Sequence, residues 1–169
     1  MAYSIYTQAG AQPIDVTSTT KRHPIGNIVR GVDPTYGEGE FIYLLGVDST
    51  VVGSLVTYAA TSGLTALTVA STDKFTGVSV AVAMSANVGS QYGWYQIGGL
   101  AVIKKTAVAV GPQVKLYLSA TNGRVKVLAS GGMLVEACKS ANLASVTTTT
   151  STVTAQIDRP HIMGPATLA

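Results

Sequence analysis

Val32-Asp33-Pro34-Thr35-Tyr36-Gly37-Glu38-Gly39-Glu40-Phe41-Ile42-Tyr43-Leu44-Leu45-Gly46-Val47 is the stretch in which this chain passes from a turn into a strand. Pro34 and Gly37 are typical of a turn, because proline presets φ and glycine tolerates positive φ. After Glu40 most residues are aromatic or aliphatic, which favours a strand. The stretch also holds three of the eight acidic residues of the chain. The first question is whether these carboxylates do chemistry or hold a surface together.

The residues before Glu40 differ from those after it. Residues 1–39 carry three of the six prolines, together with polar clusters and little periodicity. We therefore expect an extended N-terminal arm over residues 1–39, with limited structure of its own. One short apolar piece, residues 25–32, could pair as a strand. Such an arm can lie across its own domain or grip a neighbour, and residues 33–40 are expected to be its hinge.

Short strands separated by turn residues are predicted from Glu40 onward. They are expected at residues 40–47, 51–59, 64–70, 77–84, 92–104, 113–119, 124–129, 132–139 and 145–158. Asn122-Gly123 is typical of a type I′ hairpin turn, and Gly131-Gly132 and Ser62-Gly63 indicate further reversals. No segment shows helical periodicity. The sequence predicts an all-β fold, a compact β-barrel or β-sandwich of short antiparallel strands over residues 40–169, with a short C-terminal tail.

The predicted strand at residues 92–104 is long and contains the only tryptophan. Alternation places Tyr92, Trp94 and Gln96 on one face and Tyr95 with its neighbour Ile97 on the other. A Trp/Tyr face can bind sugar rings, although one tryptophan on a sheet is more often a core residue or an interface anchor. The glycine pair at positions 98 and 99 is expected to bulge or bend the strand, as barrel closure requires.

The chain is poor in charge. Charged residues make up 11% of it, against about 25% in typical proteins, and the net charge is +3. Such a chain is either a tight domain with a Thr/Ser exterior or a subunit that partners cover. The basic residues are scattered, which argues against specific nucleic-acid binding. Lys104-Lys105 is expected to be a solvated strand end and not a phosphate clamp.

Cys138 is the only cysteine, so no disulfide can form within the chain. Alternation places it on one face with Leu134 and Glu136, where a small buried hydrophobe is the expected role. The N-terminus lacks the pattern of a signal peptide, and the longest apolar run is far shorter than the ~20 residues of a membrane helix. No membrane association is expected.

The acidic residues are the first candidates for chemistry. Glu38 and Glu40 point to the same side of an extended chain, with Asp33 nearby. They could form an acid/base pair or a cation site, but Glu38 lies between two glycines and no known metal-loop spacing fits. The favoured interpretation is that these acids pair with basic groups of a partner or of this chain. The candidates within the chain are Lys21, Arg22 and Arg30.

The remaining signs of catalysis are weak. The chain has two histidines, His23 and His161, and neither lies near a cysteine or acid at metal-ligand spacing. It contains no Gly-x-Ser-x-Gly motif and no glycine-rich phosphate loop. We therefore expect a protein that is not an enzyme and needs no cofactor or metal.

Four segments of the chain resemble the capsid decoration (cement) proteins of tailed bacteriophages. They are Arg22-His23-Pro24-Ile25-Gly26, Asp33-Pro34-Thr35-Tyr36-Gly37-Glu38-Gly39-Glu40-Phe41-Ile42-Tyr43, Gln91-Tyr92-Gly93-Trp94-Tyr95-Gln96-Ile97-Gly98-Gly99 and Ala155-Gln156-Ile157-Asp158-Arg159-Pro160. The resemblance implies a small β domain with an N-terminal arm and no catalytic residues. It also implies a homotrimer, or a dimer, made in the host cytoplasm. On the virion exterior this protein would bind the major capsid protein and bridge its subunits.

Two alternatives stay open at this point. One is a virion surface module that binds carbohydrate or host through Tyr92 and Trp94, and the other is a head-fibre or tail subunit. For the decoration protein, the arm is expected to be loosely placed alone and ordered on the capsid. The residues expected at a partner interface are Arg22, His23, Arg30, Asp33, Tyr36, Glu38, Glu40, Tyr92 and Trp94.

Overall fold

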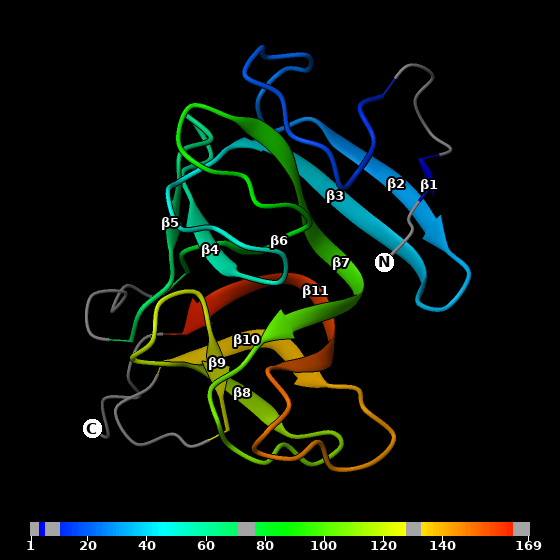
Figure 1. Cartoon of the computed structure of the whole chain (residues 1–169), viewed down its shortest axis with the longest axis vertical. Helices are drawn as coiled ribbons and strands as arrows, with labels where there is room; N and C mark the ends of the chain where they lie inside the picture. Colours follow the sequence, from blue (N-terminus) through cyan, green and yellow to red (C-terminus); the bar gives the residue numbers. More distant parts are fainter. Residues whose placement is uncertain (1–3, 6–10, 71–76, 128–132, 164–169) are drawn as a thin grey trace.

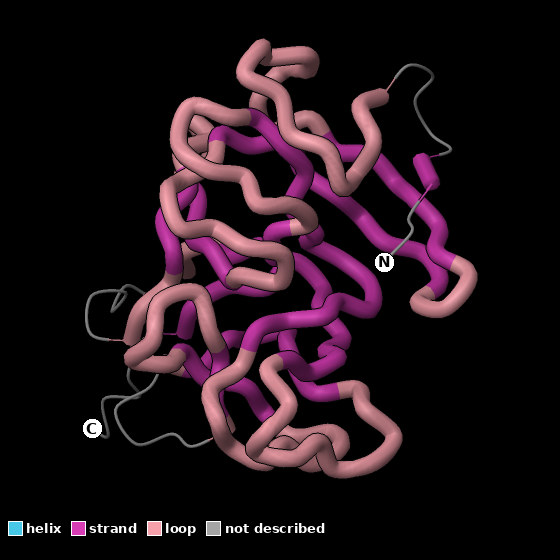
Figure 2. Tube along the Cα trace, in the orientation of Figure 1, coloured by secondary structure: helices cyan, strands magenta, loops and turns pink. Residues whose placement is uncertain are grey.

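The computed structural model describes residues 4–5, 11–70, 77–127 and 133–163. The regular structure in these ranges is β-structure without any helix, as Figure 2 shows, which confirms the predicted all-β fold. In chain order the strands are β1 (Ser4–Ile5), β2 (Ile28–Asp33), β3 (Gly37–Leu45), β4 (Leu55–Tyr58), β5 (Thr65–Leu67), β6 (Val80–Ala83), β7 (Tyr92–Lys104), β8 (Lys115–Leu118), β9 (Val125–Lys126), β10 (Leu134–Ser140) and β11 (Thr152–Met163).

The strands form one antiparallel sheet that curls into a half-barrel (Figure 1). Its order is β1-β2-β3-β7-β11-β10-β8-β9, while β4, β5 and β6 join it beside β7. β7 is the centre of the sheet because it pairs with β3, β6 and β11. In Figure 1 the ribbon of β2 and β3 projects to the right of the view, and β8 to β11 lie below it. The strand predicted at residues 92–104 is β7, with the same bounds.

Both faces of the β3–β7 pair are buried, and the alternation predicted within β7 places Trp94 on one face and Tyr95 on the other. One face carries the aromatic cluster Ile14, Val29, Phe41, Tyr43, Met84 and Trp94. The other face carries the aliphatic cluster Ile42, Leu44, Val56, Ala81, Ala83, Tyr95 and Ile97. Each large side chain that is fully buried in this way contributes roughly 1.5–3 kcal/mol. The middle of the fold is therefore a three-layer arrangement around two long strands.

The largest core cluster fills the half-barrel itself. Its members come from strands that are distant in sequence: Leu55, Val82, Ile103, Leu116, Leu118, Val125, Val135, Val153, Ile157 and Ile162 are among them. Isolated bridges between Lys105 and Val125, and between Ser79 and His161, help to draw the edges together. The hydrophobic pattern of each strand supplies one wall of this core, and the curl of the sheet encloses it.

Gly98 and Gly99 form the bend that the sequence predicts in β7. Glu40 pairs with Gly98, but Phe41 pairs with Gln96, so one residue of β7 is extra at this point. Gly99 has a φ of +94°, and a Cβ atom there would overlap the carbonyl oxygen of Glu38. Such a bulge bends its strand and increases the local twist. Because of the bend, the second half of β7 continues beside β11.

Residues from 11 onward in the N-terminal part pack on the chain's own sheet. β2 pairs with β3 along its whole length, which confirms the strand predicted within residues 25–32. Before β2, Ser18 and Tyr92 exchange backbone hydrogen bonds of 3.0 and 2.8 Å. The boundary expected between residues 39 and 40 falls inside β3. Residues 28–39 are thus part of the sheet, and the expected hinge at 33–40 is a tight turn followed by paired strand.

A bulge between β10 and β11 changes which residues share a face. Ala137 and Arg159 have positive φ values, and the register shifts between Glu136 and Cys138. Val135 and Cys138 therefore both enter the core, and the predicted face-sharing of Cys138 with Glu136 is wrong. The prediction that Cys138 is buried is confirmed. Burial raises the pKa of its thiol to about 12.

Two local predictions are corrected. β8 and β9 do pair as a hairpin, but residues 119–124 connect them in place of a two-residue turn, and only Gly123 of the predicted dipeptide has positive φ. The last strand begins at Thr152 and not at residue 145. Thr147 and Thr149 instead form an exposed turn in which their hydroxyl oxygens lie 2.8 Å apart, because short polar side chains satisfy one another locally. The predicted reversal at Gly131-Gly132 lies outside the described residues.

Candidate functional site

The candidate site is an open groove at the end of the β3–β7 pair that β4 to β6 leave uncovered. On β3, Ile42 and Leu44 lie in the aliphatic cluster, whereas Glu38 and Glu40 continue the same face beyond it. The groove has a volume of about 430 Å³. Its lining includes Arg30, Glu38, Glu40, Gly98, Gly99 and Arg159, and we call it the charged groove. Three of the residues predicted at an interface meet there.

Glu40 binds two arginines in the charged groove. Arg30 lies opposite it in the β2–β3 register and donates from Nε and Nη2 to Oε1 over 3.1 and 2.9 Å. Arg159 of β11 donates from Nη2 to Oε2 over 3.0 Å. The Glu40 side chain is 23% exposed, while those of Arg30 and Arg159 are 59% and 61% exposed. Of the basic residues proposed as partners of these acids, Arg30 pairs with Glu40, and Arg159, which was not proposed, pairs with it as well.

This ionic network contributes little to stability and much to orientation. An exposed ion pair is typically worth about 0–1 kcal/mol. Each guanidinium, however, presents its donors in a rigid plane, and a carboxylate that binds two of them limits how both can turn. Asp158 lines the groove next to Arg159. The arrangement is a surface with charges of both signs in fixed places.

The bulge in β7 makes room for the Glu40 side chain. Gly98 lies opposite Glu40 in the register, and a Cβ atom at Gly98 would sit 3.4 Å from the Glu40 Cβ. Asp158 of β11 pairs with Gly98 from the other edge of β7. The missing side chain at Gly98 thus leaves a short path across β7, along which Glu40 reaches Arg159.

The three acids of the opening stretch have different roles. Asp33 is buried, and its Oδ1 accepts hydrogen bonds from the backbone N–H groups of Thr35 and Tyr36 over 2.7 and 3.0 Å. This Asx-type turn closes the β2–β3 hairpin. Glu38 is exposed at the rim of the charged groove. In the part of the chain that the structure describes, no three His, Cys, Asp or Glu side chains are grouped as metal ligands.

The side chains of His23 and Trp94 are buried in the interior of the protein. Trp94 is fully buried, and its Nε1 donates to the carbonyl oxygen of Gln12 over 2.8 Å. The His23 ring packs on Tyr43 and Trp94 with centroid distances of 5.0 and 5.3 Å. Its Nε2 accepts a hydrogen bond from the Gln12 N–H over 3.2 Å. These side chains fasten residues 11–23 to the sheet, so they stabilise this chain itself and do not offer surface to a partner.

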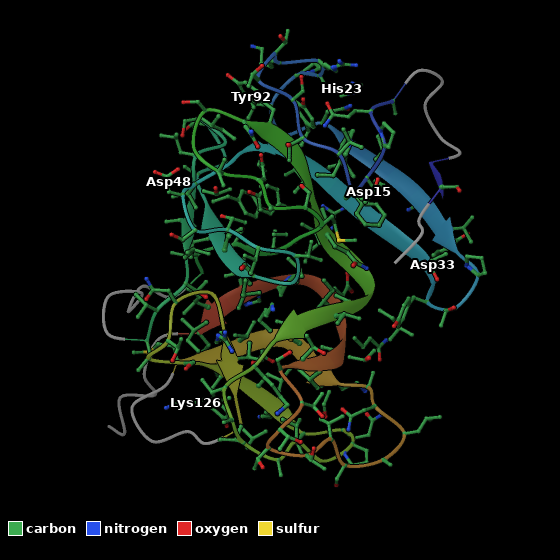
Figure 3. The ribbon with its side chains drawn as sticks, in the orientation of Figure 1. Asp15, His23, Asp33, Asp48, Tyr92 and Lys126 are labelled. Atoms are coloured by element: carbon green, nitrogen blue, oxygen red, sulfur yellow. The ribbon has the colours of Figure 1, made fainter. Side chains whose placement is uncertain are left out.

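The other predicted interface residues surround this cluster or lie apart from it. Tyr92 is half-buried and stacks on Tyr43 with the ring centroids 6.2 Å apart. Tyr36 packs at the margin of the same cluster, and Arg22 is exposed. Figure 3 shows Tyr92 and His23 near the top of the molecule and Asp33 at the far end of the β2–β3 ribbon. The nine candidates therefore do not form one site, and a flat Tyr92–Trp94 sugar platform is not present.

Burial also changes the acidity of two tyrosines, Tyr43 of β3 and Tyr95 of β7. Burial raises the pKa of Tyr43 above its usual value, partly offset by the backbone and charge of Arg22. Burial raises the pKa of Tyr95 as well, although hydrogen bonds from neighbouring side chains, including Asn87, oppose the change. Both phenols are therefore neutral structural groups at physiological pH.

Lys105 is a residue whose environment the sequence did not reveal. It was expected to be solvated, but its side chain is fully buried. Its Nζ donates to the carbonyl oxygens of Val108 and Thr147 over 2.7 and 2.9 Å, with a longer contact of 3.4 Å to Thr106. Desolvation lowers the pKa of Lys105 below its usual value. The ammonium group joins two loops, and only its position at the end of β7 could have suggested this.

Neither a scan with protein-family models nor a search of the curated proteins found a match to this chain. Among the residues that the structure describes, no helix has the length and apolar character needed to cross a membrane. The structural case for function thus depends on the surface. The charged groove presents two ordered arginines, two glutamates and an aspartate on an open face, which suits recognition of another surface.

Proposed function

We propose that this protein is a structural subunit of a tailed-bacteriophage virion, with no catalytic role. It binds the outer surface of the head as a homotrimer, bridges neighbouring major capsid subunits and stabilises the mature capsid. The proposal combines the resemblance of four sequence segments with the all-β fold and the low charge content of the chain.

The observation that carries the proposal is the open face of β2 and β3 around the charged groove. Ile28 and Val32 are 41% and 43% exposed and lie on either side of Arg30, on the same face of β2. Apolar side chains next to an ordered ionic network are typical of protein–protein interfaces. An open face of this kind suits a protein partner better than a small substrate, which is usually bound in an enclosed pocket.

The proposed mechanism is mechanical reinforcement of the phage head. A subunit that contacts two neighbouring capsid proteins adds buried area across the joint between them, and about 1,600 Å² is enough for a specific interface. The network of Glu40 with its two arginines contributes specificity, because a wrong register would bring like charges together. Several modest contacts on one oligomer act at high effective concentration, so the assembled subunit binds tightly.

The direct test is sedimentation with phage heads. The purified protein should pellet with expanded heads of its source phage and stay in solution with unexpanded precursor heads. An Ile28→Ser, Val32→Ser double variant should bind at least roughly tenfold more weakly, because it removes the apolar part of the face. Val16→Ser is the matched control, since Val16 is also 44% exposed but lies outside this face. Failure to bind either kind of head would overturn the proposal.

A further inference from the structure

A second groove is lined by residues that precede β4, by Lys104 at the end of β7 and by the loop between β8 and β9. It has a volume of about 500 Å³. Its described lining contains two cations, several hydroxyl or amide side chains and no acidic residue; the polar members are Ser49, Ser54, Lys104, Thr121, Asn122 and Arg124. We call it the basic groove. The chain has only 11 lysines and arginines, and two of them meet here with no carboxylate among the described lining residues.

The two cations of the basic groove lack an ionic partner within the described part of the chain. Both ion pairs found there belong to Glu40, in the charged groove. Arg124 donates one hydrogen bond from Nη1 to the carbonyl oxygen of Lys105 over 3.0 Å, which leaves further N–H groups of its guanidinium for a ligand. Asp48, which precedes the groove residue Ser49, accepts instead from the N–H of Gly89 over 3.0 Å.

The walls of the basic groove are held in place by the backbone. The Lys104 N–H donates to the carbonyl oxygen of Gly53 over 2.8 Å, and the Leu55 N–H donates to the carbonyl oxygen of Gly123 over 2.9 Å. Arg124 is also tied to the backbone, because its Nη1 donates to the carbonyl oxygen of Lys105. A site whose walls are already ordered loses little conformational freedom when it binds. Lys104 and Arg124 are both half-buried, so water screens their charges less than it screens those of fully exposed side chains.

We propose that the basic groove binds an acidic segment of a protein partner, with a carboxylate between Lys104 and Arg124. A peptide is favoured over a small free anion because the rim is apolar: Val51 lines the groove at 46% exposure, and Val52 beside it is 52% exposed. A peptide can cover these side chains while its carboxylate meets the cations. The identity of the partner as a capsid subunit rests on the proposed function, whereas the chemistry of the groove does not.

The test uses the full chain and a short capped peptide of alternating glutamate and valine that carries a fluorescent label. Fluorescence anisotropy at low salt should show binding of this peptide and not of its glutamine–valine counterpart. Lys104→Gln and Arg124→Gln should each weaken binding by roughly fivefold, as expected for partly screened ion pairs. Lys115→Gln is the matched control, because it removes an exposed lysine that lies outside the groove.

The outcomes separate this inference from its rivals. No binding of the glutamate peptide, or equal losses in all three variants, would overturn it, because the attraction would then be absent or nonspecific. Inorganic phosphate that bound more tightly than the peptide would also overturn it in favour of a small-anion site. If the protein pelleted with phage heads but did not bind the peptide, the proposed function would be supported. The role proposed for the basic groove would then be wrong. The tryptophan emission of each variant checks that it is folded.

Discussion

Arg159 donates a hydrogen bond to Glu40 over 3.0 Å, although 119 positions separate the two residues in the sequence. The bond crosses β7 at the glycine bulge and joins β11 to β3. Arg159 has a φ of 47°, which is uncommon for a residue with a side chain. The bulge in β11 thus points the Arg159 guanidinium toward Glu40. The ionic contact between these residues therefore connects the bulge in β11 with the bulge in β7.

Glu40→Gln removes the shared partner of Arg30 and Arg159. We expect the free energy of unfolding to fall by less than about 1 kcal/mol, because both arginines are exposed and screened by salt. Urea denaturation at low and high ionic strength measures the loss, which should shrink as salt rises. Asp15→Asn, at an exposed acid outside the charged groove, should change nothing. A loss of several kcal/mol would mean that the network is a structural element of the core.

Gly99→Ala combines backbone strain with a collision against the Glu38 carbonyl. We expect it to lower the free energy of unfolding by roughly 2–4 kcal/mol. Gly37→Ala is the matched control, because Gly37 also has positive φ but a Cβ atom there would meet nothing within 4 Å. The control should cost only about 1 kcal/mol of strain. Equal losses in the two variants, by urea denaturation, would contradict the close approach at the bulge.

Lys105→Met keeps most of the side-chain volume but removes the buried ammonium. We expect a loss of about 1–3 kcal/mol, because the carbonyl oxygens of Val108 and Thr147 lose their charged donor. Lys104→Met, at the neighbouring half-buried position, should stay within about 0.5 kcal/mol of the wild type. Thermal and urea unfolding both report the difference. A stabilised Lys105→Met variant would show that the desolvation of the ammonium outweighs its hydrogen bonds.

Cys138 should make the protein lose stability in alkaline solution. Its thiol pKa is raised from 9.0 to about 12, so above pH 9 the unfolded chain releases a proton that the folded chain retains. The stability from the neutral thiol is complete below pH 9 and falls, by up to about 1.4 kcal/mol per pH unit, until pH reaches about 12. Urea titrations at several pH values measure the slope. Cys138→Ala should flatten it between pH 9 and 10, and an unchanged slope would contradict the assignment.

Ile14→Ala tests whether the N-terminal segment is part of the core. Ile14 is buried in the cluster that contains Trp94, the only tryptophan, so its truncation should cost about 2–4 kcal/mol. It should also shift the tryptophan emission to longer wavelength as water approaches the indole. Val16→Ala, at an exposed position two residues later, should do neither. Unchanged emission in Ile14→Ala would mean that this segment leaves the sheet in solution.

Local patterns predicted the strands better than they predicted their partners. The bounds of β7, the sharing of its two faces among the aromatic side chains and the bend at Gly98-Gly99 all follow from residues that are adjacent in sequence. The all-β class follows in the same way, from strand-forming residues punctuated by turns. The exposed threonine turn before Thr152 was missed because threonine suits both strands and local hydroxyl contacts.

Only some residues of the candidate site could be predicted from the sequence. The pairing of Arg30 with Glu40 could be predicted, since both lie near one turn, whereas Arg159 comes from the far end of the chain. The burial of His23 could not be predicted, because it depends on which face of the sheet the N-terminal segment crosses.

By itself the sequence determined that this chain forms strands, where β7 begins and ends and which of its side chains share a face. These properties depend on φ/ψ preference and on the period of two along a strand, which are local. Only the tertiary structure decided that Val135 and Cys138 share the core, that Lys105 is buried and that Arg159 reaches Glu40. The physical reason is that bulges and register arise where two distant strands meet, and one extra residue there reverses every face that follows.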